Sequence, residues 1–250
     1  MKTLVIMNEK GGVGKTNIVA HAAWYFAERY RSLIIDLDQQ ANLSATLSDY
    51  PVSVQSIQLF DKAVKIAPTG LLTLARSTRE LLEVDTGDPS LIEIFRTNLG
   101  AIRNDFDICV VDTPPALTNR TFAAILAADA ILAPIGINDY SITGITELLR
   151  AIKGVSAFYK REEPMFLGLL PSIFDRKSRD ERQMFESLVK QVGKILFPGI
   201  VAKRDSYRRA ATARKPVWLM KGASAQEAGV EIRGVFTSIE KQMELRYGQE

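Results

Sequence analysis

Residues 10–16 read Lys10-Gly11-Gly12-Val13-Gly14-Lys15-Thr16, and they follow a short apolar run at residues 3–7. A strand, a glycine-rich turn and a helix in this order form a phosphate cradle, because glycines let backbone N–H groups converge on phosphate oxygens. The helix N-terminus adds its dipole, Lys15 adds a charge for the outer phosphates, and the Thr16 hydroxyl is placed to ligate Mg²⁺. Asn17 can donate a further hydrogen bond to phosphate. This stretch predicts a P-loop nucleotide-binding site.

Apolar runs alternate with helical patterns along the rest of the chain. Continuous apolar runs are typical of strands buried on both faces of a parallel sheet. They lie at residues 3–7, 32–37, 71–75, 108–112, 130–135, 166–172 and 200–202. Helical patterns lie at residues 15–30, 90–104, 117–128, 142–159 and 179–192, and from about 225 to 246. The alternation predicts an α/β fold with a doubly wound, mostly parallel sheet flanked by helices.

The composition is that of a soluble globular protein. Of 250 residues, 46% are hydrophobic and 24% charged, and no Pro/Gly/Ser linker divides residues 1–250, so we expect a single domain. The one cysteine, Cys109, excludes an internal disulfide and a Cys-rich metal site, and we expect an inert core thiol. His21 is interpreted as a packed helix residue. With no apolar run of membrane-spanning length and no leader, we expect a cytoplasmic protein.

Two of the predicted strands end in acids. Asp36 lies near the end of the run at residues 32–37, and Asp38 directly follows this run. Asp112 is the last residue of the run at residues 108–112. Mg²⁺ prefers oxygen ligands and is usually held by one or two carboxylates together with phosphates and water. Solvated acids at strand ends are the alternative interpretation, and either motif alone is weak. Their order and spacing after the P-loop favour a metal site.

The phosphate loop departs from the strict pattern in an informative way. Glu9 stands where that pattern has glycine, and Lys10 adds a second lysine ahead of the glycines. The run resembles the deviant Walker A motif of the ParA/MinD group of ATPases. The resemblance implies that ATP closes a homodimer in which Lys10 reaches the partner's nucleotide, so that hydrolysis depends on dimerisation. Glu9 replaces a frequent Gln of that group, and Asn17 a frequent Thr or Ser.

The resemblance continues along nearly the whole chain. Residues 36–40 are similar to the family's D-x-D-P-Q segment, with Gln39 replacing proline, which implies that Asp38 positions or activates the attacking water. Residues 112–115 are similar to its D-x-P-P segment. The metal set implied is Thr16, Asp36 and Asp112, and residues 133–135 with 140–152 resemble the next strand and helix. The implied base-flanking residues are Pro171, Ser172, Lys203 and Arg204, and Lys215-Pro216-Val217 resembles a late G-K-P segment.

Positive charge is concentrated near the C-terminus. Residues 201–222 contain seven basic residues and one acid, in a chain whose net charge is +3. Such a cluster on a mildly acidic body favours a polyanion partner, and contacts with DNA phosphates would not read sequence. A solvated basic face is the alternative. The candidate DNA-binding residues are Arg176, Lys177, Arg179, Arg208, Arg209, Arg214 and Lys215.

The first hypothesis is therefore a partition ATPase. Iron–sulfur relatives need cysteines that this chain lacks. With its first strand at residue 3, the chain resembles the short form without an N-terminal helix-turn-helix, and its partners would be nonspecific double-stranded DNA on the nucleoid and a ParB-like protein. A MinD-like membrane-associated ATPase is one alternative, because an apolar stripe runs along the last helix, although core packing is the simpler interpretation. Its members are Ile232, Val235, Phe236, Ile239 and Met243. A nucleotide-gated adaptor for conjugation or secretion is the other alternative, left open by Glu9 and Gln39.

Overall fold

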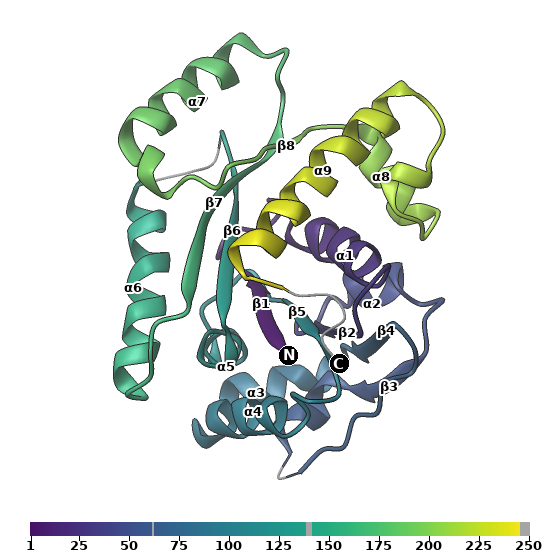
Figure 1. Cartoon of the computed structure of the whole chain (residues 1–250). Coiled ribbons are helices and arrows are strands. Elements are labelled where there is room, and N and C mark those ends of the chain that lie inside the picture. The colour runs from purple at the N-terminus through teal and green to yellow at the C-terminus, as the bar shows by residue number, and fades with distance from the viewer. Residues whose placement is uncertain (62, 139–141, 246–250) are drawn as a thin grey trace.

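The fold is a parallel sheet covered by helices on both faces (Figure 1). The computed structural model describes residues 1–61, 63–138 and 142–245. Within these residues the sheet has eight strands in the order β3-β4-β2-β5-β1-β6-β7-β8, and every neighbouring pair is parallel. The predicted doubly wound α/β architecture is confirmed.

The strands follow the apolar runs closely. They are β1 (Lys2–Ile6), β2 (Ser32–Asp36), β3 (Val52–Gln55), β4 (Leu72–Arg76), β5 (Ile108–Asp112), β6 (Ala130–Gly136), β7 (Met165–Phe174) and β8 (Val201–Ala202). The predictions missed only β3, which lies at the edge of the sheet. Its single fully buried residue is Val54, so it carries too little apolar sequence to be recognised.

The helices divide into long ones that were predicted and short ones that were not. The helices expected from the sequence are α1 (Lys15–Phe26), α4 (Ser90–Ala101), α5 (Asn119–Ala127), α6 (Ile142–Phe158), α7 (Arg179–Val192) and α9 (Ala223–Gln242). The additional ones are α2 (Asn42–Thr46), α3 (Leu82–Thr86) and α8 (Asp205–Thr212). These have too few turns for a clear helical period. Tyr140 and Arg246, which the predictions included, lie outside the described residues, as do residues 139 and 141.

Alternate residues of each central strand enter two separate cores. Leu4 and Ile6 of β1 pack into a core shared with α1 and α9, whereas Val5 and Met7 pack into a core shared with α4, α5 and α6. Figure 1 shows these helices on the two sides of the sheet. None of the helices in the described ranges is both long and apolar enough to span a membrane.

The registers bring the acids and the phosphate loop to one edge. Ile6 at the end of β1 is level with Asp112 of β5, and Asp112 is level with Asp36 of β2. In an open α/β sheet, ligands bind outside the carboxyl ends of the strands. Three segments far apart in the sequence therefore meet where a phosphate would lie.

Candidate nucleotide site and basic surface

The phosphate loop takes a conformation that needs its glycines. Gly12 and Gly14 have φ angles of 77° and 85°, in the left-handed region that side chains disfavour. Gly14 is also the N-cap of α1, and a Cβ there would lie 3.0 Å from Ser172 Oγ on β7. A Cβ added to Gly11 would lie 4.0 Å from the Cβ of Pro115, in the turn after β5. The loop thus lies between β7 and the segment that follows β5.

Lys15 folds back over the start of this loop. Its Nζ donates to the carbonyl oxygens of Asn8 at 2.9 Å and Lys10 at 3.0 Å. Burial lowers the pKa of Lys15, while the charges of Asp112 and Asp38 act to raise it. Asn8, which the sequence analysis missed, fixes the same turn. Its Oδ1 accepts from the Lys10 backbone N–H and its Nδ2 donates to the Pro134 carbonyl oxygen.

Asp112 is a buried acid without a hydrogen-bond donor. Neither of its carboxylate oxygens accepts a hydrogen bond from any residue that the structure describes. Burial, followed by the charge of Asp36, raises the pKa of Asp112 well above its usual value. The Thr16 hydroxyl, which is near the carboxylate without forming a hydrogen bond of good geometry, and then the Lys15 charge act in the opposite direction. A buried carboxylate normally has a partner. The site therefore fits a cation, with Thr16 and Asp112 as the available oxygen donors.

Asp36 is engaged quite differently. Its Oδ2 accepts from the backbone N–H and hydroxyl of Ser44 at 2.8 and 2.7 Å, and its Oδ1 accepts from the Asp38 N–H at 3.1 Å. Burial raises the pKa of Asp36 to about 6, although the bonds from Ser44 act to lower it. Both oxygens are taken by the chain itself. Asp36 thus holds the loop that follows β2, through its hydrogen bonds with Asp38 and Ser44. Its contact with a metal ion remains a prediction.

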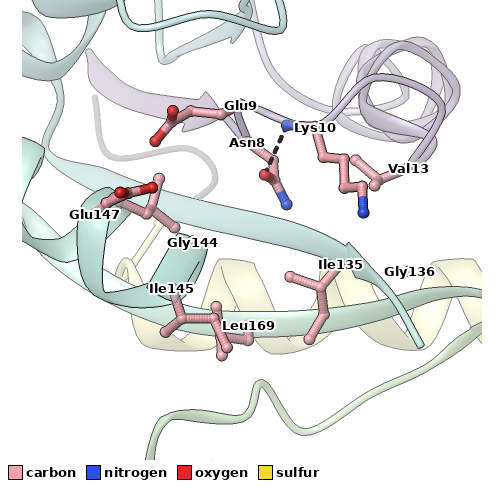
Figure 2. A pocket seen from close by; sticks show the side chains of 11 residues that line it. Asn8, Glu9, Lys10, Val13, Ile135, Gly136, Gly144, Ile145, Glu147 and Leu169 are labelled. Atoms are coloured by element: carbon pink, nitrogen blue, oxygen red, sulfur yellow. Dashed lines mark hydrogen bonds between the residues drawn. The ribbon is translucent and has the colours of Figure 1, made fainter. Parts of the chain in front are cut away.

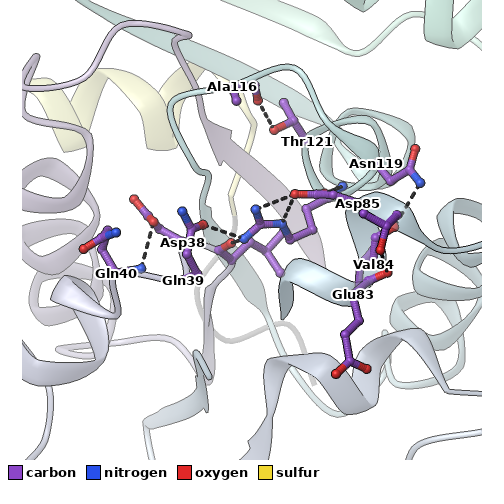
Figure 3. A network of polar contacts seen from close by, with 12 residues as sticks. Asp38, Gln39, Gln40, Glu83, Val84, Asp85, Ala116, Asn119 and Thr121 are labelled. Carbon is purple, nitrogen blue, oxygen red and sulfur yellow. Dashed lines mark hydrogen bonds and ion pairs between the residues drawn. The ribbon is translucent and has the colours of Figure 1, made fainter. Parts of the chain in front are cut away.

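The loop that carries Asp38 is held from several sides. The Asp38 carbonyl oxygen accepts from Ser77 Oγ at 2.6 Å, and its Oδ1 accepts from the Gln40 N–H at 3.0 Å. Arg120 of α5, which was not predicted from the sequence, donates to the Leu37 carbonyl oxygen and to the Gln39 side chain of the same loop. Figure 3 shows the polar network that joins Gln39 and Asp85. The sequence feature that could have drawn attention to Arg120 is that it is the one charged residue in the helix predicted at 117–128.

Glu9 points away from the phosphate loop. Figure 2 shows the Glu9 and Lys10 side chains directed in opposite ways, with Glu9 facing Glu147 of α6 across a cavity of about 290 Å³. Burial first, and then the Glu147 charge, raise the pKa of Glu9. An acid beside a phosphate loop would repel a triphosphate, and the orientation of the Glu9 side chain reduces that repulsion.

The expected base-flanking residues come from two adjacent strands. Pro171 and Ser172 lie in β7, where Ser172 pairs with Val201 of β8 and borders Gly14. Lys203 follows β8 and is exposed. The Arg204 guanidinium instead contacts α9, at 2.7 Å from a Glu227 oxygen and 3.2 Å from a Glu231 oxygen. Asn17 lines a hollow beside Thr16 at the start of α1.

Most of the predicted DNA-binding arginines are exposed and paired with acids. On α8, Arg208 and Arg209 contact Asp205 at 2.8 and 3.5 Å. Arg214 contacts Asp49 at 2.9 Å. The remaining candidates lie elsewhere in the surface: Arg176 contacts Glu231 at 3.0 Å, Lys177 and Arg179 are exposed at the start of α7, and Lys215 is exposed after α8. Figure 1 shows α7 and α8 in separate parts of the molecule, so the seven candidates do not form one compact cluster.

His21 joins α1 to the segment after α8. It is buried, its Nδ1 lies 2.8 Å from the Asn17 carbonyl oxygen, and its Nε2 accepts from the Val217 N–H at 3.2 Å. Because Nε2 accepts, the proton of the neutral ring is on Nδ1. Burial lowers the pKa of His21 from 6.5 to about 4. His21 is a packed residue, as the sequence predicted, and Cys109 is a buried thiol.

Comparisons with known proteins agree with this geometry. The sequence model of a family described as "AAA domain" matches residues 1–163. Protein IncC of Escherichia coli is 34% identical and aligns with 98% of this chain and 71% of its own length. The chromosome partitioning protein ParA of Caulobacter vibrioides (strain NA1000 / CB15N) is 28% identical, with 90% of each chain covered. This chain belongs to the ParA-type family of AAA-domain proteins.

Solved structures show the same fold as this ParA-type protein. A variant of Cyanothece McdA in complex with ATP superposes with a TM-score of 0.80 at 20% identity, covering 100% of this chain and 99% of that one. A putative plasmid partition protein of Borrelia burgdorferi bound to AMPPNP gives 0.74 at 19% identity, covering 95% and 99%. In the ParA-type chain described here, the phosphate loop, Asp38 and Asp112 occupy one edge of that fold.

Proposed function

We propose that this ParA-type protein is a slow, partner-stimulated ATPase that binds DNA nonspecifically as an ATP-closed dimer and is released by hydrolysis. The observation that carries the nucleotide part is Asp112, a buried carboxylate that accepts no hydrogen bond of good geometry from the described residues and lies near Lys15 and Thr16. Thr16 and Asp112 would hold Mg²⁺, and the ion would neutralise charge on the phosphate oxygens. The relative named chromosome partitioning protein ParA supports the assignment of the cargo as DNA.

The phosphate loop, Lys15, Asp38 and Lys10 each have a role in the proposed reaction. The backbone N–H groups of residues 11–16 bind phosphate oxygens and Lys15 pairs with the outer phosphates. Asp38 accepts a hydrogen bond from the attacking water and so aligns it with the outer phosphorus. Lys10 of each protomer would neutralise charge at the partner's nucleotide, which makes turnover depend on dimerisation.

DNA binding is assigned to the exposed arginines of α8 and its neighbours. Surface ion pairs contribute little to stability, so Arg208, Arg209 and Arg214 can exchange their acids for phosphates at little cost. Contacts of this kind depend on charge and not on base sequence. A ParB-like protein would then stimulate hydrolysis and release the dimer from the nucleoid in the cytoplasm.

The apolar stripe of α9 does not favour the membrane alternative. Ile232, Val235, Phe236, Ile239 and Met243 are all buried in the core that α9 shares with α1. A membrane-binding helix must present such a stripe to lipid. Core packing, the simpler of the two interpretations, is what the structure shows for these residues.

A gel shift with an unrelated DNA duplex tests the proposal. The protein with Mg²⁺ and ATP, ADP or no nucleotide is titrated across a salt series. We expect tight binding only with ATP, and a steep loss of affinity with salt because phosphate contacts release counterions. No binding at low salt and micromolar protein would exclude the DNA function. Binding to vesicles instead would favour the membrane alternative, and ATP binding without turnover in the presence of DNA and partner would favour the adaptor.

A further inference from the structure

Arg120 is the feature of the loop edge that the proposed mechanism has not used. It is the second residue of α5, and α5 is the helix that follows β5, the strand that ends at Asp112. Only 2% of its side chain is exposed. A buried guanidinium is costly unless its donors are satisfied, so its contacts show what it is placed to hold.

One side of the guanidinium binds an acid. Arg120 Nε and one terminal nitrogen donate to Asp85 Oδ2 of α3, at 3.0 and 2.5 Å. Asp85 is itself mostly buried, with 17% of its side chain exposed. A paired, charge-assisted contact of this kind fixes the plane of the guanidinium.

The other side binds the loop on both sides of Asp38. The second terminal nitrogen donates to the Leu37 carbonyl oxygen at 2.9 Å and to Gln39 Oε1 at 2.8 Å (Figure 3). Leu37 and Gln39 are the residues immediately before and after Asp38. A single nitrogen therefore contacts both neighbours of the residue proposed to align water.

We propose that Arg120 is a positioning residue that fixes the loop 37–39, and with it the Asp38 carboxylate, against α5. This inference rests on the proposed ATPase function of Asp38. Lysine cannot replace it, because an ammonium lacks the planar fork that binds Asp85 with one side and the loop with the other. Gln39 is the residue through which Arg120 reaches the far side of Asp38.

The two sides of Arg120 allow a purely structural role to be separated from a positioning role. Gln39 is only half-buried and contacts Arg120 through its side chain. Gln39→Leu therefore removes the side-chain contact of the loop with Arg120, and leaves the contact with the Leu37 carbonyl oxygen and the ion pair with Asp85 in place. Gln39→Glu keeps an acceptor for Arg120 and serves as the conservative rescue. Asn98→Ala is the matched control, because the buried Asn98 donates to the carbonyl oxygens of Leu59 and Asp61 and has no hydrogen bond to the loop 37–39.

The experiment measures kcat, KM and Mg²⁺-ADP affinity of the full chain, with hydrogen exchange of the peptide covering residues 37–40. For Gln39→Leu and Arg120→Lys we expect kcat to fall about tenfold, the size of effect that a small misplacement of a reacting group produces. ADP affinity should stay within about twofold, because the phosphate loop is unchanged. Exchange at residues 37–40 should rise in both variants. Gln39→Glu should restore kcat, and Asn98→Ala should change neither kcat nor exchange.

Two results would overturn the proposal. Unchanged exchange at residues 37–40 in both Gln39→Leu and Arg120→Lys would show that Arg120 does not hold the loop. Raised exchange with unchanged kcat would show a structural contact without a positioning role. If the unsubstituted protein hydrolyses no ATP under any condition, the proposed function fails, and with it the positioning of a water-aligning Asp38. The exchange measurement alone would then report whether Arg120 orders the loop.

Discussion

The sheet edge that carries the phosphate loop, Asp36, Asp38 and Asp112, called here the nucleotide edge, and the surface of α8 both concentrate charge. They hold that charge in opposite ways. At the edge, Lys15, Asp36, Asp112 and Arg120 are each at most 7% exposed. On α8, Arg208 has 76% of its side chain exposed. The partners at the edge are mainly backbone groups and buried side chains, whereas those on α8 are surface acids.

This difference separates a site with fixed geometry from a surface with exchangeable contacts. Buried charges stay in place because moving or unpairing them in a low-dielectric interior is costly. Exposed ion pairs are worth about 1 kcal/mol or less and are screened by salt. The edge is thus suited to aligning a reaction, and α8 to a charge-based contact that hydrolysis can reverse. Four measurements test this contrast.

The largest expected effect is at the fixed site. Lys15→Ala should weaken nucleotide binding about 100-fold, because it removes a charge-assisted contact worth about 3 kcal/mol. Calorimetric titration with Mg²⁺-ADP measures the affinity. Lys153→Ala, an exposed lysine of α6, is the control and should bind as the unsubstituted protein does. Equal affinities in the two variants would contradict the placement of the phosphates.

His21 connects α1, at the phosphate loop, with the segment that follows α8. Its burial should make the free energy of unfolding sensitive to acid. Its pKa is about 4 in the folded protein and 6.5 when unfolded, so the unfolded chain binds the proton first as pH falls. Stability from this group is complete above pH 6.5 and is lost between about 6.5 and 4. From pH 7 to pH 5 the loss is about 2 kcal/mol. Urea unfolding of the protein and of His21→Gln at both pH values measures the difference, and parallel pH profiles would contradict it.

A smaller effect is expected when the exchangeable surface is neutralised. The double variant Arg208→Ala/Arg209→Ala should bind unrelated DNA about tenfold more weakly, and its salt slope should fall by about 2, since each phosphate contact contributes about 0.9. Fluorescence anisotropy across a salt series measures both quantities. Arg29→Ala/Arg31→Ala is the control, because these arginines are also exposed and ion-paired but lie outside the predicted surface. A matching loss in the control would refute a specific role for α8.

The smallest effect should come from releasing one surface arginine. Asp49→Ala removes the acid that contacts Arg214. Thermal stability should change by no more than about 0.5 kcal/mol, as is usual for an exposed pair. DNA affinity should rise about twofold, because Arg214 no longer exchanges an acid for a phosphate. A large loss of stability would mean that this contact is fixed like those of the nucleotide edge.

The sequence predicted the parts of the site that follow from local chain chemistry. The phosphate loop needs its glycines at closely spaced positions, and the acids lie at the ends of apolar strands, so both are visible in the sequence. Asn8, Ser44, Ser77 and Arg120 were missed, because each acts through a contact with a segment distant in sequence. The hydrogen bonds of Asp36 with Ser44 and Asp38 were not predicted either, and they show that both of its carboxylate oxygens already have donors within the chain.

The sequence by itself determined the α/β fold, the order of its elements and the nucleotide loop, because apolar period and glycine spacing are local properties of a chain. Only the tertiary structure decided which charges are fixed and which are free to exchange. It placed Arg120 against the loop of Asp38, turned Glu9 away from Lys10, and distributed the basic residues over separate elements. Burial and pairing depend on what the rest of the chain places around a side chain, and no local pattern records that.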